Sequence, residues 1–415
     1  MVATSSLMPN TTLQRKVVRT LATAQVLNGV GVAGTVAAGS LLVSSITKSE
    51  GLSGLAQTTS VLGAAVMALP LARLTQRGGR RLALTVGYSA GVIGAALAIF
   101  GGTQKILFFM LLGAFLVGAA SASGYQARFA AIDLATAENR SKNLSFVVWG
   151  STIGAVTGPN LMEPSGKFAV FLGLPKLVGP YFIAATTLAF AVIVIQLFLK
   201  PDPYLLANRS SDGLTQKKHE TTRAALAHIR KYPVALFAIA AVAIGHLAMV
   251  SIMVMTPVHM AHFDVTLRII GFVISVHVLG MYAFSPIVGT ISDKIGRIKT
   301  IQIGIVILTA SAIISGLAPH HNSFILGIGL FLLGLGWSFT LIAGSTLLSE
   351  TVSIDMRPST QGASDLVMNL MGAGGAAVGG VIIGIFSYAA LCYATAIVVI
   401  ALGIWSIKLQ RSKVI

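Results

Sequence analysis

Four side chains with soft ligand atoms lie on two apolar segments of the C-terminal half. Met249 and Met253 are four residues apart, and His277 and Met281 repeat that spacing. Residues at i and i+4 share one face of a helix, so each segment would present two of these side chains together. Thioether sulfur and imidazole nitrogen suit Cu(I) and suit Mg²⁺ or Ca²⁺ poorly. The spacing therefore favours a site for a soft metal ion such as Cu(I), which the imidazole of His246, one turn before Met249, could join.

The same residues have a packing interpretation. The chain holds 13 Met, and methionine commonly fills gaps between packed helices. Histidine inside a membrane is harder to explain in that way, because an ionisable group in lipid needs a partner or a function. His259 and His262, toward the outer end of the first segment, are candidates for collecting metal at an entrance. A wetted helix end is the commoner reason for such residues.

The elements that position these side chains are membrane spans. The chain is 55% apolar and 10% charged, with a mean hydropathy of +0.84, which leaves too little polar surface for a water-soluble globule. A spanning helix needs about 20 mostly apolar residues. We count twelve such segments, centred near positions 32, 63, 92, 116, 153, 189, 246, 278, 309, 335, 373 and 398. The predicted fold is an all-α polytopic membrane protein.

Charge gives the orientation and the domain organisation. The net charge is +17, and with a cytoplasmic N-terminus all but five of the 29 Lys and Arg fall in cytoplasmic segments. The positive-inside rule thus favours cytoplasmic termini in a cell membrane, and nucleic-acid binding is not needed to explain the positive net charge. The longest polar stretch has a turn-rich start, PDPY and NRSSDG. It divides the chain into a six-helix bundle (1–199), a cytoplasmic central loop (200–232) and a second six-helix bundle (233–415).

A glycine-rich turn follows the eighth predicted span. The segment GTISDKIGRIK begins at Gly289 and contains Asp293, Gly296 and Arg297. Its glycines permit two helix ends to approach, and its Asp and Arg can clamp neighbouring helices. The segment resembles the loop motif of the major facilitator superfamily, whose transporters have two six-helix bundles. The equivalent loop after the second span ends similarly but has Gln76 where the motif has Asp.

A narrower resemblance concerns Met249, Met253, His277 and Met281, which we call the Met/His set. The arrangement MxxxM followed by HxxxM, with the flanking text MVMTPVH and HVLGMYAFSP, is similar to that of bacterial copper importers of the CcoA type. This resemblance implies that Met249, Met253, His277 and Met281 bind copper and pass it across the membrane by alternating access. Copper would then be the transported substrate, and no cofactor is expected.

A second hypothesis keeps the fold and changes the substrate: a proton-coupled exporter of drugs or small metabolites. Asp365 lies at the start of the eleventh span, and burial favours the neutral form of a carboxyl group, so Asp365 is a candidate for proton coupling. The structural alternative is an ion pair with Arg128 or Arg357. Gly150, Gly154 and Gly158 in the fifth span resemble a motif of proton-coupled antiporters, although close helix packing also explains them.

Other function classes find no support in the sequence. It contains no HExxH, GxSxG or GxxxxGK[ST] motif, so we expect neither an enzyme nor an ATP-driven pump. A non-transporting receptor or assembly factor is a third hypothesis, for which no extra soluble domain is present as a signalling output. We expect a monomer whose partners are a small solute or metal ion and membrane lipid.

Overall fold

The computed structural model describes residues 11–48, 52, 54–211, 232–261, 263, 265, 267–319 and 322–411, and contains helices and no strands in these ranges. His262 lies outside them. The helices are α1 (Thr11–Thr47), α2 (Leu55–Gln104), α3 (Leu107–Ala130), η2 (Ala137–Asn139), α4 (Arg140–Asn160), α5 (Met162–Phe171), η3 (Lys176–Val178), α6 (Gly179–Phe198), α7 (Pro203–Ser211), α9 (Pro233–Ala261), α10 (Leu267–Tyr282), α11 (Ser285–Ile295), α12 (Arg297–Leu317), α13 (Ser323–Thr351), α14 (Arg357–Ile385) and α15 (Tyr388–Arg411).

Ten helical stretches in the described ranges are long and apolar enough to cross a membrane. The prediction of an all-helical membrane protein is thus confirmed, whereas the count of twelve spans stays a prediction. α2 is 50 residues long and is interrupted at Gly79, whose φ of 85° and ψ of 176° are not helical. α4, with 21 residues, is not among the ten stretches.

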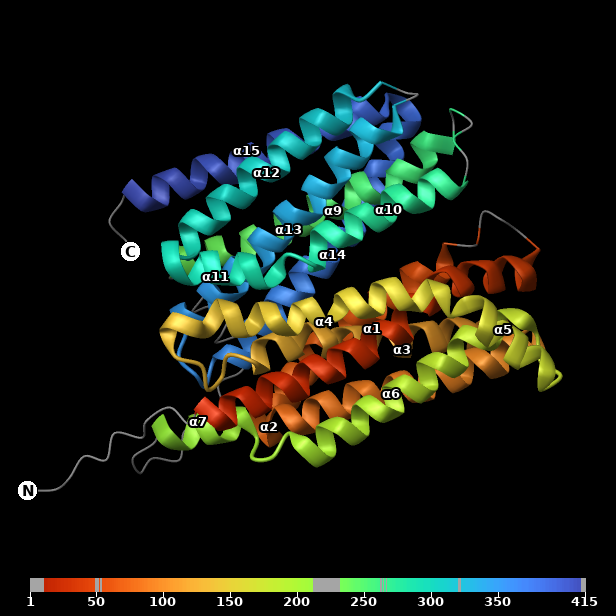
Figure 1. The fold of residues 1–415 in the computed structure, drawn as a ribbon, viewed down its shortest axis with the longest axis horizontal. Coiled ribbons are helices and arrows are strands. Elements are labelled where there is room, and N and C mark those ends of the chain that lie inside the picture. Colours follow the sequence, from red (N-terminus) through yellow and green to blue (C-terminus); the bar gives the residue numbers. More distant parts are fainter. Residues whose placement is uncertain are drawn as a thin grey trace, which may run out of the picture.

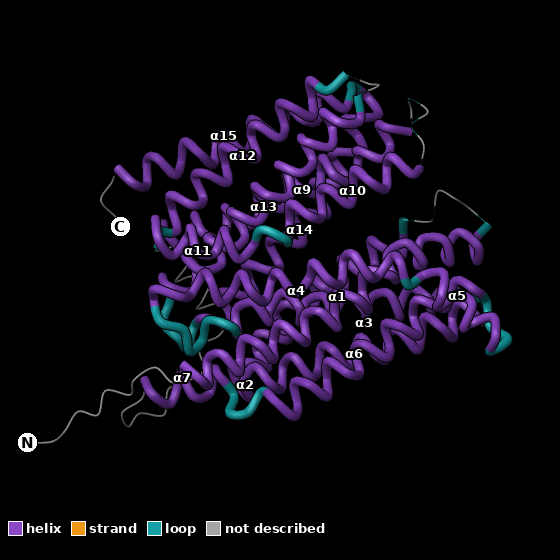
Figure 2. The backbone as a smooth tube through the Cα atoms, in the orientation of Figure 1, coloured by secondary structure: helices purple, strands orange, loops and turns teal. Residues whose placement is uncertain are grey.

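The helices form two groups (Figure 1): α1 to α7, the N-terminal group, and α9 to α15, the C-terminal group. Figure 2 shows that short loops join nearly all of them. The predicted domain boundaries stay a prediction. The turn-rich start predicted for the central loop is wrong, because α7 occupies Pro203–Ser211. Proline fits the first turn of a helix, and Asp202 Oδ1 accepts hydrogen bonds from Tyr204 N and Leu205 N.

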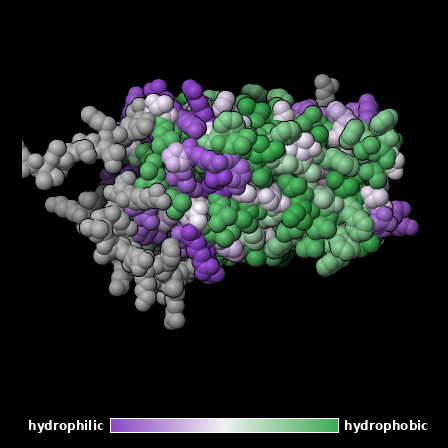
Figure 3. Space-filling model, turned by 90° about the horizontal axis from the view of Figure 1, so that it is seen from below, coloured by the Kyte–Doolittle hydropathy of each residue, from purple (hydrophilic) through white to green (hydrophobic). Residues whose placement is uncertain are grey.

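Apolar side chains cover much of the outer surface. Phe272, Val306 and Ile397, on α10, α12 and α15, are 69%, 67% and 68% exposed. Figure 3 shows apolar residues over the middle of one face and hydrophilic residues gathered toward its two ends. A continuous apolar surface of this kind is unfavourable in water and suits lipid. The functional polar groups are therefore to be sought between the helices.

Glycines bring α1 and α4 into close contact. A methyl carbon added at Gly154 would lie 2.3 Å from the carbonyl carbon of Gly29, and one added at Gly158 would lie 3.0 Å from Gly34 N. Backbones approach this closely only where side chains are absent. The surroundings of Gly154 and Gly158 are therefore those of closely packed helices. This contact fixes the distance between α1 and α4.

We expect Gly154→Ala to lower the stability of the folded chain by about 1–3 kcal/mol, because the methyl group must push two helix backbones apart. The measurement is thermal unfolding of the purified protein in detergent. Gly384→Ala is the matched control, since a methyl carbon there meets nothing within 4 Å. Equal melting temperatures for the two variants would contradict the steric argument.

Candidate functional site

A cavity of about 170 Å³ lies between the two helix groups. Helices α1, α3 and α4 line it from the N-terminal group, and α10 and α13 line it from the C-terminal group. The lining residues are Gln25, Asn28, Gly29, Val32, Ala33, Ser121, Gly124, Tyr125, Arg128, Val147, Val148, Ser151, Ala155, Tyr282, Trp337 and Leu341. Substrate sites of transporters built from two repeats lie at such a boundary.

A buried ion pair joins the two groups beside this cavity. Arg128 Nη2 on α3 lies 2.5 Å from Asp365 Oδ1 on α14, and both side chains are at most 2% exposed. Arg128 Nε donates to Ser345 Oγ on α13 at 3.2 Å. The guanidinium also lies 4.6 Å from the centroid of the Phe129 ring. Among the described residues, Asp365 Oδ2 has no hydrogen-bond partner. Arg128 is one of the two partners that the sequence offered for Asp365.

A second buried ion pair lies closer to the end of the molecule at which α1 begins and α15 ends. Arg80 Nε is 2.7 Å from Asp133 Oδ2, and both side chains are at most 1% exposed. Arg80 Nη2 also donates to Gln361 Oε1 on α14 at 2.7 Å, which connects the two groups. Gln76, the residue that departs from the loop motif, donates to the carbonyl oxygen of Asp355 at 3.2 Å. Although Gln76 departs from the motif, it still forms a hydrogen bond between the two helix groups.

The predicted gating residues meet the start of α4. Asp293 accepts hydrogen bonds from the backbone N–H groups of Ser141 (3.0 Å) and Lys142 (2.8 Å). Carboxylates are favoured at a helix N-terminus, where such N–H groups have no partner within the helix. Gly296 has a φ of 93°, which glycine adopts without strain. A methyl carbon at Gly289 would lie 2.6 Å from the carbonyl oxygen of Ser141.

A charged cluster extends this contact. Arg297 Nη1 lies 3.1 Å from Asp293 Oδ1, and Arg297 Nη2 lies 2.9 Å from Glu350 Oε1. Glu350 also pairs with Arg140 of α4 at 3.3 Å. In the described part of the chain, the side-chain hydrogen bonds and ion pairs seen between the two groups all lie toward this end. This end, at which α1 begins and α15 ends in Figure 1, is therefore the one held closed.

The Met/His set surrounds α13. His277 Nδ1 on α10 donates to the carbonyl oxygen of Leu330 at 2.8 Å, which leaves Nε2 with a free lone pair and no hydrogen-bond partner among the described residues. On α9, His246 Nδ1 accepts from Trp337 Nε1 at 3.1 Å, so that its lone pair is occupied. α13 packs against both α9 and α10, which touch each other little.

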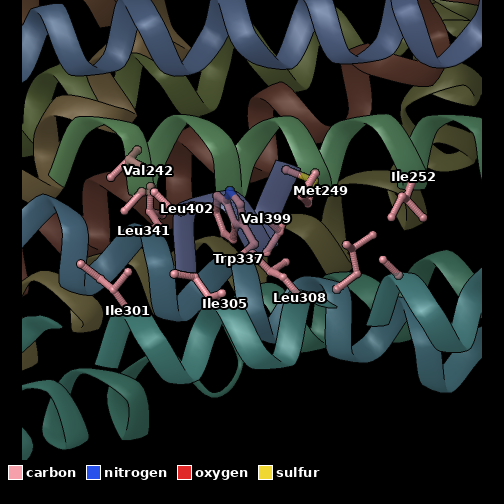
Figure 4. Packing of buried hydrophobic residues seen from close by; sticks show 14 of the residues in the cluster. Val242, Met249, Ile252, Ile301, Ile305, Leu308, Trp337, Leu341, Val399 and Leu402 are labelled. Atoms are coloured by element: carbon pink, nitrogen blue, oxygen red, sulfur yellow. The ribbon is translucent and has the colours of Figure 1, made fainter. Parts of the chain in front are cut away.

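The methionines and the outer histidine have mainly apolar surroundings. Met249 and Met281 belong to one buried hydrophobic cluster, with Met253 packed against it. Figure 4 shows Met249 in this cluster with Trp337. The His259 ring stacks on Tyr388, with centroids 4.3 Å apart. In the described ranges, no group of three or more His, Cys, Asp or Glu could hold a metal ion. The copper site stays a prediction.

Known proteins place the chain in a family. The model of the Major Facilitator Superfamily matches residues 21–268 and 246–414. The chain belongs to the Major Facilitator Superfamily. It is 34% identical over 380 residues to the uncharacterized MFS-type transporter YdeG of Bacillus subtilis (strain 168), covering 91% of this chain and 88% of YdeG. It is 27% identical over 368 residues to the riboflavin transporter RfnT of Brucella anthropi, covering 87% of each.

A solved structure agrees with this assignment. The E. coli fucose:proton symporter FucP superposes with a TM-score of 0.72 at 16% identity, covering 94% of this chain and 98% of FucP. At that identity the likeness shows the fold alone. The protein is therefore a multi-pass membrane transporter of this superfamily, and its fold is one of transporters and not of enzymes.

Several cavity residues were not singled out from the sequence. Gln25 and Asn28 lie three residues apart within the first span, and Tyr125 lies one turn before Arg128. The available signal was their polarity, because a polar side chain inside an apolar span suggests a functional site by default. The predicted gating residues, by contrast, were singled out from a local motif.

Proposed function

We propose that the chain is a secondary transporter that moves a small organic solute through the central cavity by alternating access, working as a monomer in the cell membrane. The observation that carries this proposal is the cavity between the helix groups with the buried Arg128–Asp365 pair beside it. The scaffold is two six-helix bundles. The break in α2 at Gly79 and the length of α4 support twelve spans.

The ion pair supplies a coupling mechanism. A carboxylate holds a guanidinium by charge and hydrogen bonding, and a protonated carboxyl group holds it far less strongly. Proton binding at Asp365 would therefore release Arg128 and loosen the contact between α3 and α14. With cytoplasmic termini, as the charge distribution predicts, the closed end is cytoplasmic. Protonation would then favour opening of the cavity toward the cytoplasm.

The first solute to test is riboflavin, because the relative RfnT transports it and aromatic side chains line the cavity here. We expect proteoliposomes containing the chain to take up radiolabelled riboflavin faster with a proton gradient than without one. Asp365→Asn should remove the dependence on the gradient. Uptake no faster than in protein-free liposomes would exclude riboflavin, and uptake indifferent to the gradient would contradict proton coupling.

Copper import is the second candidate, and the observation favouring it is the buried, unpartnered Nε2 of His277 one turn from Met281. The test compares cell-associated copper by elemental mass spectrometry in a copper-starved host. The host would express the wild type, an empty vector, or a Met249→Leu/His277→Leu variant shown to reach the membrane. Accumulation with the wild type alone would support copper import; equal copper in all three would exclude it.

A further inference from the structure

Two amide side chains of α1 converge on one glycine of α3. A methyl carbon added at Gly124 would lie 2.5 Å from Asn28 Nδ2 and 3.1 Å from Gln25 Oε1. All three residues line the cavity between the helix groups. We call Gln25, Asn28 and Gly124 the amide notch. The missing side chain at Gly124 leaves room for both amide groups to pack against α3 beside the cavity.

Each amide in the notch has an acceptor oxygen without a partner. Gln25 Nε2 donates to Ser151 Oγ at 2.8 Å, which fixes the amide, while Gln25 Oε1 is buried and accepts no hydrogen bond in the described part of the chain. Asn28 Oδ1 is in the same condition, and Asn28 is only 5% exposed. Buried carbonyl oxygens are nearly always hydrogen-bonded, because losing water without a replacement costs free energy. Two such oxygens, both on residues that line one cavity, indicate a ligand that brings donors once the amides turn toward it.

The rest of the cavity indicates a flat and uncharged ligand. Tyr125, Tyr282 and Trp337 line it, and the Tyr282 ring meets the Trp337 ring edge to face with centroids 5.6 Å apart. Arg128 is the charged residue among the lining residues seen in the structure, and Asp365 neutralises it. Aromatic walls favour a planar solute. A charged ligand would therefore find no unpaired opposite charge among these lining residues.

We propose that the amide notch selects an uncharged planar heteroaromatic solute that presents N–H donors, which Gln25 Oε1 and Asn28 Oδ1 accept. This inference rests on the proposed function and names the substrate class of its cavity. The selectivity arises because a solute without donors leaves both oxygens unpaired, and a site built to form hydrogen bonds rejects such analogues strongly.

The test uses three pairs of probes that differ in N-methylation: uracil and 1,3-dimethyluracil, xanthine and caffeine, lumichrome and its 1,3-dimethyl derivative. Binding to the purified full chain in detergent is measured from the concentration dependence of its thermal stabilisation. We expect at least one unmethylated probe to bind, and its methylated partner to bind at least about tenfold more weakly.

Substitutions in the notch should reduce this preference to about twofold or less. Asn28→Leu and Gln25→Leu remove the acceptors, and Gly124→Ala adds a methyl group 2.5 Å from Asn28 Nδ2, which displaces the Asn28 amide. The readout is the affinity ratio within a probe pair, which general loss of stability does not change. Gln302→Leu is the matched control, because Gln302 pairs with Ser406 and Gln410 outside the cavity and should leave the ratio unaltered.

Three results would overturn the inference: no binding of any unmethylated probe, equal binding within every pair, or an unchanged ratio in all three notch variants. The second or third of these, together with riboflavin uptake that a cross-link of the closed end abolishes, would reject the reading of N–H donors by the amide notch and leave alternating access standing. Failure of that cross-link to affect transport would instead reject the proposed function.

Discussion

Replacing Asp365 by alanine should abolish proton-dependent solute transport and destabilise the chain by about 3–5 kcal/mol, because Arg128 would remain as a buried charge without a partner. The two side chains are 2% and 1% exposed, so water cannot compensate for the loss. Ser345 supplies a hydrogen bond to Arg128 but no charge. The measurements are thermal unfolding in detergent and uptake by proteoliposomes with and without a proton gradient.

A double variant separates stability from function. Arg128→Met/Asp365→Ala removes both charges, and replacing a complete buried ion pair with apolar residues is often neutral or stabilising. We expect this variant to melt near the wild-type temperature and still lack transport that depends on the proton gradient. Glu163→Ala is the control, since the Glu163–Lys167 pair is 68–74% exposed and its loss should leave the melting temperature unchanged. Wild-type melting and transport in Asp365→Ala would refute the coupling role.

The features that were predictable from the sequence are those encoded by neighbouring residues. Apolar stretches of spanning length predict the helical membrane fold, and the turn around Gly296 is recognisable because its glycines and charged residues follow one another within one segment. Such features need no knowledge of the tertiary arrangement.

The cavity was not predictable in the same way. Arg128 and Asp365 are 237 residues apart, and Arg80 and Gln361 are 281 residues apart, so no periodicity connects them. Helical spacing shows which side chains share a face of one helix but not how that helix is rotated against its neighbours. His246 and His277 illustrate this limit, because each contacts α13, at Trp337 and Leu330 respectively.

The largest effect on transport that leaves the cavity untouched should come from cross-linking the closed end. Ser141 of α4 and Ser292 of α11 belong to different helix groups, and their hydroxyl oxygens are 2.9 Å apart. Two thiols placed there can reach disulfide bonding distance with small side-chain rotations. In a Cys392→Ser background, which removes the chain's single cysteine, oxidised Ser141→Cys/Ser292→Cys should transport at least about tenfold more slowly than the wild type.

Reduction should restore the rate, because the bond blocks a movement and not the site. The matched control is Ser285→Cys/Ser338→Cys, whose hydroxyl oxygens lie 3.2 Å apart within the C-terminal group, between α11 and α13. A cross-link there holds together helices that move as one body in alternating access and should leave transport intact. If both cross-links slow transport equally, the two groups do not move as rigid units. If neither does, the contact at Asp293 does not open during the cycle, and transport by alternating access through this end is rejected.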